Sequence, residues 1–414
     1  MRPAPSTPVS SVLTPGSMSI TLPGRTCAAG TRRPTSTVND TNHRWAMRET
    51  VADKIRAVPA SRRTARPLKG TVRGGWRPGA VGMLADVITR DEIRTTYDII
   101  RPYIRRTPVV RLSLNDLDPA VTLKLEQLQC SGSFKARGAF TNLLLRDVPP
   151  AGVVAASGGN HGVAVAYAAH RLGVPARIFV PTVSARAKVE RIRQLGAELV
   201  VTGERYADAL AAAQDWERSS GAMSVHAFDQ RETLLGQGTL ALELAGQAPD
   251  LDAGDLDTVL VPVGGGGLIG GIAAWFGGEV RVIGIEPEGA PTLTRARAEG
   301  RPADAPAEGV AADALAPRRV GELVFPITQA YVEDVVLVDD TSILAAQRAL
   351  WQAARIAAEP AASVGIAALL TGGYKPAPGE HVAVVISGAN MSPAQLETRG
   401  DQGAQDARSD KYVL

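Results

Sequence analysis

A lysine lies in an unusual position in the segment from Ser131 to Ala139, which has the sequence Ser-Gly-Ser-Phe-Lys-Ala-Arg-Gly-Ala. Small residues precede Lys135, and a helix is expected to begin just after Ser133. The positive end of the helix dipole disfavours a cation there. This lysine therefore either faces solvent or acts as a neutral amine or a Schiff-base nucleophile. Taken alone, the segment favours a solvent-facing lysine.

Two further loops join small residues to polar side chains at the expected ends of strands. The segment Ser157-Gly-Gly-Asn160-His161 precedes a predicted helix, and backbone N–H groups at a helix start bind anions such as carboxylates. The alternative is a tight turn in which Asn160 caps the helix. After the last predicted strand, Ser387 offers a hydroxyl that could meet a heterocyclic nitrogen. A helix cap explains this serine equally well in isolation.

A run of four glycines follows the strand predicted over residues 258–263. Their backbone N–H groups can approach a phosphate closely. No Lys-Ser/Thr pair follows the run, so it is not a Walker loop. Gly265, Gly267 and Gly270 also match the pattern Gly-x-Gly-x-x-Gly, and Glu286 ends the next strand. A dinucleotide site is therefore an alternative to a simple phosphate site.

Apolar strands alternate with helices from residue 83 onward, which predicts mostly parallel sheets covered by helices. Strands are predicted over residues 121–128, 152–157, 176–181, 198–202, 258–263, 280–285, 335–338 and 382–387. Helices are predicted over residues 91–104, 160–171, 185–195, 206–218, 232–245 and 343–358, besides the one that begins after Ser133. In such sheets ligands bind at the carboxyl ends of the strands, where all four loops are expected to lie.

Together the four loops provide a phosphate cradle, a lysine, an anion-binding loop and a hydroxyl, which is the set that a pyridoxal phosphate site needs. Residues 85–390 also resemble the fold-type II pyridoxal-phosphate enzymes, specifically their threonine/serine dehydratase branch. Besides the four loops, the matching motifs are Lys124-Leu-Glu126-Gln127, Gly236-Gln-Gly-Thr239 and Glu286-Pro287, all in the family's order.

The resemblance implies a role for each loop. Lys135 would hold the cofactor as a Schiff base and then act as the base at the substrate α-carbon. Phe134 would pack against the ring, Asn160 would bond its 3′-oxygen, and Ser387 would meet its nitrogen. The cofactor phosphate would be bound by Gly264, Gly265, Gly266, Gly267 and Leu268. The substrate carboxylate would be received by Ser157, Gly159, Asn160 and His161.

The resemblance also implies a reaction, the α,β-elimination of L-threonine and/or L-serine to a 2-oxo acid and ammonia. Ala136 stands where synthases of the superfamily carry aspartate, which favours the dehydratase branch. Serine racemases place a second serine at the position of Gly158, so its absence disfavours racemization. The alternatives are a lyase for another β-hydroxy amino acid, a serine racemase or a threonine-synthase-like enzyme. Two alternatives come from other functional classes. One is a cofactor-binding protein with little catalysis, and the other is a module that binds nucleic acid or a protein partner.

Several residues near these motifs have simpler interpretations. The family's cation site, near Glu286 and Ala290, usually includes an acid where Thr292 stands. No metal is therefore expected, and Glu286 and Ala290 are the remaining candidates. Residues 300–320 are expected to form a surface loop. Glu359 is expected to end a helix before Pro360, with a carboxylate that faces the cofactor as the alternative.

The resemblance implies two domains, a large cofactor domain over residues 83–151 and 230–390 and a small domain over 152–229. A tail would follow over residues 391–414. Residues 1–82 hold 14 Lys and Arg against 3 Asp and Glu, whereas residues 83–414 hold 31 against 39. The basic segment is expected to be disordered. Three explanations of this segment compete: a targeting peptide, a basic interaction arm, or a stretch upstream of a true start at Met83. The explanation with a true start at Met83 is favoured.

The composition of the chain limits which classes of protein it can belong to. The chain has 414 residues, of which 45% are hydrophobic, and two cysteines far apart, Cys27 and Cys130. This excludes a disulfide scaffold and indicates a reducing compartment. We expect a cytoplasmic enzyme that takes a small amino-acid substrate and forms a homodimer, the state usual in the resembled family. No apolar run is long enough to span a membrane. The net charge of +3 gives no reason to expect a nucleic-acid partner of the catalytic part.

Overall fold

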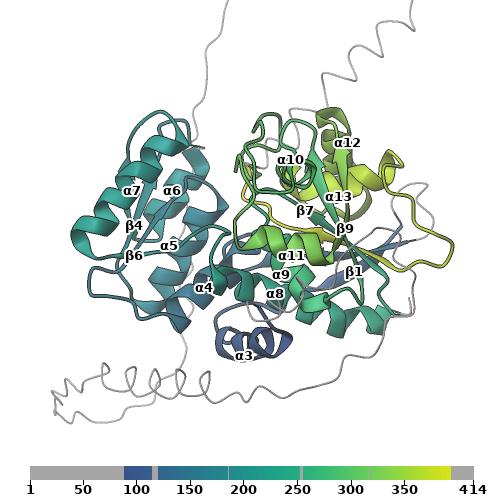
Figure 1. The fold of residues 1–414 in the computed structure, drawn as a ribbon, viewed down its shortest axis with the longest axis horizontal. Coiled ribbons are helices and arrows are strands. Elements are labelled where there is room, and N and C mark those ends of the chain that lie inside the picture. Colours follow the sequence, from purple (N-terminus) through teal and green to yellow (C-terminus); the bar gives the residue numbers. More distant parts are fainter. Residues whose placement is uncertain (1–87, 114–119, 185, 252–254, 316, 393–414) are drawn as a thin grey trace, which may run out of the picture. The chain divides into compact units, whose positions relative to one another are not determined.

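The computed structural model describes residues 88–113, 120–184, 186–251, 255–315 and 317–392 (Figure 1). The predicted basic segment 1–82 lies outside the described residues, and so does the predicted tail from residue 393 onward. Two sheets form in the described part, one of six strands and one of four. All pairs of named strands are parallel except one. The predicted α/β class with mostly parallel sheets is therefore confirmed.

The six-stranded sheet has the order β1-β2-β10-β7-β8-β9. Its strands are β1 (Val109–Leu112), β2 (Val121–Leu125), β7 (Thr258–Pro262), β8 (Arg281–Pro287), β9 (Val332–Val338) and β10 (Val382–Ile386). The antiparallel pair is β1 with β2, at one edge. In β7 the neighbouring residues Val259 and Leu260 are fully buried in two different hydrophobic cores. Such a strand is covered on both faces, which explains its continuous apolar sequence.

Helices provide the cover on each face of this sheet (Figure 1). The core that contains Val259 also holds residues of α3 (Arg90–Ile100), α8 (Arg231–Gln247), α9 (Gly267–Phe276), α10 (Thr292–Glu299) and α11 (Val324–Tyr331). The core that contains Leu260 holds residues of α12 (Asp340–Ala354) and α13 (Pro360–Leu370).

The four-stranded sheet has the order β5-β4-β3-β6 and is parallel throughout. Its strands are β3 (Val153–Ala156), β4 (Ala176–Val180), β5 (Glu198–Val201) and β6 (Met223–Ser224), and its helices are α5 (Asn160–Leu172), α6 (Arg186–Gln194) and α7 (Tyr206–Ser220). Val154 packs in the same core as α7, whereas Ala155 packs in the same core as α5. This sheet too is therefore covered on both faces.

One helix, α4 (Lys135–Leu145), packs against both α5 and α8. It therefore contacts one helix that covers each sheet. Phe140 of α4 and Ile100 of α3 lie in the same core as the four-stranded sheet. The two sheets fall within the predicted residue ranges, but this shared core crosses the boundary predicted at residue 152. The division into a large and a small domain therefore stays a prediction.

Element boundaries differ from the predicted ones where a tertiary contact intervenes. The predicted strand 121–128 ends at Leu125, and Glu126–Leu128 forms a 3₁₀ turn that directs the Glu126 carboxylate toward Arg137. Strand β1 was not predicted, because its four residues show no alternation of their own and depend on pairing with β2. The predicted loop 300–320 has no helix or strand among its described residues, but several of its side chains are buried.

Candidate active site

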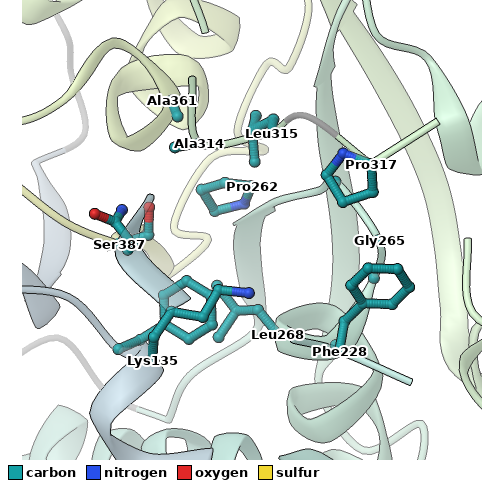
Figure 2. Close-up of a pocket in the computed structure, with 15 residues that line it drawn as sticks. Lys135, Phe228, Pro262, Gly265, Leu268, Ala314, Leu315, Pro317, Ala361 and Ser387 are labelled. Carbon is teal, nitrogen blue, oxygen red and sulfur yellow. The ribbon is translucent and has the colours of Figure 1, made fainter. Parts of the chain in front are cut away.

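A pocket at the carboxyl ends of β7 and β10 contains residues from all four predicted loops (Figure 2). The predicted cofactor residues that line it are Phe134, Lys135, Asn160, Gly264, Gly265, Gly266, Gly267, Leu268 and Ser387. Figure 2 shows Ser387 on one side, Phe228 on the other, and the Lys135 amine directed into the space between them. The loops therefore meet where the sheet topology predicts a ligand.

Lys135 is the first residue of α4, and its side chain is half-buried. Its Nζ donates to the carbonyl oxygen of Ala227 at 2.9 Å and lies 5.1 Å from the centroid of the Phe134 ring. Burial lowers the pKa of Lys135 to about 8, since desolvation disfavours the ammonium form. A larger fraction of neutral amine is thus available near neutral pH than for an ordinary lysine, as a nucleophile requires. The catalytic role of Lys135 stays a prediction.

The lysine segment is fixed to the segment that carries Ser387. The backbone N–H of Phe134 donates to the carbonyl of Ser387 at 3.1 Å, and that of Ala389 donates to the carbonyl of Gly132 at 3.0 Å. Gly132 has a φ of +78°, and a Cβ on it would lie 2.2 Å from the Asn390 amide oxygen. These hydrogen bonds therefore hold the backbone before Lys135 against the backbone that carries Ser387.

A fully buried ionic network supports α4 from below. The Arg137 guanidinium lies 2.7 Å from Glu126 and 2.8 Å from Glu243, and Lys124 lies 2.8 Å from Glu243. Each of these four side chains is essentially inaccessible to solvent. Paired charges in such a place fix geometry strongly, because breaking one pair leaves a buried charge uncompensated. The motif Lys124-Leu-Glu126 thus acts on the orientation of the lysine helix.

The glycine run forms a tight loop into the N-terminus of α9. Gly266 has a φ of +85°, which favours glycine. A Cβ on Gly265 would lie 2.4 Å from the Phe228 ring, and one on Gly267 would lie 2.8 Å from the Phe228 Cα. The first backbone N–H groups of a helix have no partner within the helix and bind anions readily. Phe228 therefore explains why Gly265 and Gly267 carry no side chains, and the N-terminus of α9 explains why the loop suits a phosphate.

Asn160 begins α5 and is held in one orientation. Its Oδ1 accepts from the Asn390 amide at 2.9 Å, and its Nδ2 donates to Glu359 Oε2 at 2.8 Å. Glu359 is buried and precedes Pro360, the first residue of α13. The expectation that Glu359 ends a helix is therefore wrong, because α12 ends at Ala354 and Glu359 stands before the start of α13. Its carboxylate fixes which side of the Asn160 amide can donate a hydrogen bond in the pocket.

The residues predicted to receive the substrate carboxylate differ in position. Asn160 lines the pocket. The His161 ring is buried and bonds the carbonyl of Val225 at 2.8 Å, and burial lowers its pKa to about 3. Its neutral ring is therefore occupied, leaving its backbone as the group that could bind a carboxylate. Ser157 Oγ accepts from the N–H of Gly159 at 3.2 Å. The carboxylate assignment stays a prediction.

A buried lysine joins α6 to the elements around the pocket. The Lys188 side chain is 3% exposed, pairs with Asp313, and has its Nζ 3.6 Å from Glu359 Oε1. Glu359 Oε1 is itself buried and accepts no hydrogen bond from the described residues. This lysine was not predicted, because its partners lie more than a hundred residues away in the sequence.

The predicted surface loop 300–320 also forms part of the pocket. Ala314, Leu315 and Pro317 line it, and the Cα of Leu315 lies 3.2 Å from the place of a Cβ on Gly264. The expectation of a plain surface loop was therefore wrong at these residues. Their small apolar side chains gave no signal, since such residues are common in ordinary loops.

Glu286 does not face a ligand. Its carboxylate is fully buried and accepts hydrogen bonds from the N–H groups of Leu293 and Thr294, at the start of α10. Burial raises the pKa of Glu286, while these hydrogen bonds oppose that rise. A ribose-binding role, as in a dinucleotide site, is therefore wrong for this residue. Across the described residues, no group of three or more His, Cys, Asp or Glu could hold a metal ion.

A family model described as pyridoxal-phosphate dependent enzyme matches residues 100–388, more than half of the chain. The chain belongs to this family. Its relatives assign it to the fold-type II enzymes and to their threonine/serine dehydratase branch, as the sequence predicted, and pyridoxal phosphate is its cofactor. The pocket fits this group. The glycine loop lines the pocket with backbone alone, and a lysine of lowered pKa and a serine hydroxyl line the same pocket.

Three relatives show the range of the branch. The chain is 35% identical to an L-threonine ammonia-lyase of Thermotoga maritima, over 75% of this chain and 78% of the relative. It is 38% identical to a phenylserine dehydratase of Ralstonia pickettii, over 71% and 91%. The solved structure of maize serine racemase matches with a TM-score of 0.69 and 30% identity, over 78% and 99%. Among the described residues, no helix is long and apolar enough to cross a membrane.

Proposed function

We propose that this enzyme catalyses the α,β-elimination of L-threonine and/or L-serine and releases a 2-oxo acid and ammonia. The observation that carries the proposal is the pairing of Lys135, a lysine of lowered pKa, with the neutral hydroxyl of Ser387 in one pocket. A neutral partner at the cofactor nitrogen suits reactions in which the β-substituent leaves promptly. Relatives named L-threonine ammonia-lyase support the same reaction.

The residues would divide the work as follows. When bound, the cofactor supplies an electron sink for the carbon that carries the amino group. The Lys135 amine would accept the proton from that carbon. The C–O bond to the β-hydroxyl would then break, and the hydroxyl would leave as water by taking up one proton, in net balance the one removed from the carbon. The glycine loop would hold the cofactor phosphate, and Asn160, oriented by Glu359, would donate to the ring oxygen. The released enamine hydrolyses in water to the 2-oxo acid and ammonia.

Racemization is the main alternative within the branch, because several relatives are named serine racemases. Gly158 offers no side chain that could return a proton to the opposite face of the substrate. A Cβ at this position would lie 2.0 Å from the hydroxyl oxygen of Ser184. A side chain at this position would require the Ser184 segment to move. The absence of a second serine here supports elimination over racemization.

The proposal also covers other β-hydroxy amino acids. A relative named phenylserine dehydratase supports such a range. We also propose that the enzyme acts in the cytoplasm and forms a homodimer. Light scattering of the purified protein would measure the oligomeric state.

The test is a substrate panel with purified holoenzyme. L-Threonine, L-serine and L-threo-phenylserine are each incubated with the enzyme, and 2-oxo acid, ammonia and D-amino acid are measured. We expect 2-oxo acid and ammonia in equal amounts and no D-serine from the wild type, and neither product from Lys135→Ala. If D-serine forms faster than pyruvate, the enzyme is a serine racemase and the proposed elimination is not its main reaction. A panel that yields no product of any kind contradicts the elimination.

A further inference from the structure

Beneath the glycine loop, a single hydroxyl joins three elements. Thr292 Oγ1 lies 2.6 Å from the carbonyl oxygen of Gly264, the first residue of the loop, and 2.9 Å from Glu286 Oε1 at the end of β8. Thr292 also begins α10. Thr292 and Glu286 are fully buried. The hydroxyl therefore ties the loop after β7 to β8 and to α10 in a place that water does not reach.

The rest of the Glu286 carboxylate is already occupied. Oε1 also accepts from the N–H of Leu293 at 2.6 Å, and Oε2 accepts from the N–H of Thr294 at 2.9 Å and from its hydroxyl at 2.8 Å. Amide and hydroxyl hydrogens thus surround this carboxylate. Calcium and magnesium need several oxygen ligands and repel such hydrogens, so the residues present do not fit a divalent cation.

We infer that Thr292 takes the place that a bound cation occupies in relatives with an acid at this position. It is a positioning residue that holds the glycine loop in its cofactor-binding shape without a metal. The inference rests on the proposed role of the loop in binding the cofactor phosphate. It leads to the expectation that cofactor retention and thermal stability in this enzyme are independent of divalent cations.

The first experiment uses the wild-type holoenzyme. The protein is dialysed against EDTA and then supplied with magnesium, calcium or manganese, while cofactor absorbance and the melting temperature are followed. We expect no change in either quantity. A loss of cofactor or a lower melting temperature in EDTA, restored by one of the cations, would overturn the inference.

Two variants test the hydroxyl directly. Thr292→Val keeps the shape but removes the hydroxyl that contacts both the Gly264 carbonyl and Glu286 Oε1. We therefore expect the dissociation constant for pyridoxal phosphate to rise about tenfold. Thr292→Ser keeps the hydroxyl and is the matched control, expected to bind the cofactor as the wild type does. Equal cofactor affinity in Thr292→Val and Thr292→Ser contradicts the positioning role.

A further variant, Gly266→Ala, tests the proposed role of the loop separately from the role of Thr292. Full cofactor affinity in this variant would contradict the loop as the phosphate site. The response of the wild type to EDTA would still decide the role of Thr292.

Discussion

At the scale of single residues, the site depends on two unlike devices, a lysine that burial makes less basic and a loop that cannot carry side chains. Burial acts on Lys135 through solvation, and no carboxylate contributes to the lowered pKa. In the glycine loop the constraint is steric, because Phe228 occupies the space beside Gly265 and Gly267. Each device can be tested separately, since one responds to pH and the other to volume.

The lowered pKa predicts how the apoenzyme captures its cofactor. Only the neutral Lys135 amine can form a Schiff base, and its fraction grows as pH rises through about 8. The rate of covalent capture should therefore increase about tenfold per pH unit below that value and level off above it. Stopped-flow absorbance between pH 6 and 10 measures this rate. A rate that keeps rising up to pH 10 would indicate an ordinary lysine.

The steric constraint predicts the effect of a single methyl group. Gly265→Ala should place its Cβ against the Phe228 ring, distort the loop and weaken cofactor binding by tenfold or more, about 1.4 kcal/mol. Gly246→Ala is the matched control, because no atom lies within 4 Å of its Cβ and it sits inside α8. It should be neutral or slightly stabilising. Equilibrium dialysis and thermal melts compare the two, and equal affinities would contradict the steric explanation.

At the scale of elements, the pocket depends on side chains that reach between helices and loops. Lys188 connects α6 to the loop at Asp313 and to Glu359 before α13, while Glu359 orients Asn160 at the start of α5. None of these contacts lies within one element. A small shift of α6 would therefore change the orientation of Asn160 in the pocket.

Removal of the Lys188 charge should expose this dependence. Lys188→Met leaves Glu359 buried without its nearby cation, so we expect a loss of about 2–4 kcal/mol in the free energy of unfolding. We also expect a higher KM, with a smaller change in kcat, because Asn160 would be less well oriented. Asp313→Asn, at the exposed end, should cost less than about 1 kcal/mol. Urea denaturation and steady-state kinetics measure both, and identical effects of the two variants would refute the role of Lys188.

At the scale of the whole molecule, the sequence was informative where chemistry is local. The four loops are each a few residues long, so Lys135, the glycine run and Ser387 could be recognised from small residues at strand ends. The positions of Glu359 and Leu315 could not be assigned in this way. Leu315 lines the pocket and Glu359 contacts Asn160 only because elements distant in the sequence pack together, and both residue types are common elsewhere.

Charge also divides along the whole chain, and this predicts the behaviour of a truncated protein. Residues 1–82 carry 14 basic and 3 acidic side chains, and the remainder carries 31 and 39. The chain that starts at Met83 should keep the cofactor and the specific activity of the full chain. Any binding of nucleic acid should be confined to the full chain and weaken steeply with salt. Filter binding at several salt concentrations tests this, and binding by the shorter chain would contradict it.

The contact between Gly158 and Ser184 couples two positions that lie 26 residues apart in the sequence. A Cβ at position 158 would lie 2.0 Å from the Ser184 Oγ and 2.5 Å from its Cβ, so the effect of a substitution at one position should depend on the residue at the other. Gly158→Ala alone should lower the melting temperature, whereas the same substitution beside Ser184→Gly should cost less. A double-mutant cycle measured by thermal melts tests this coupling, and additive effects would contradict it.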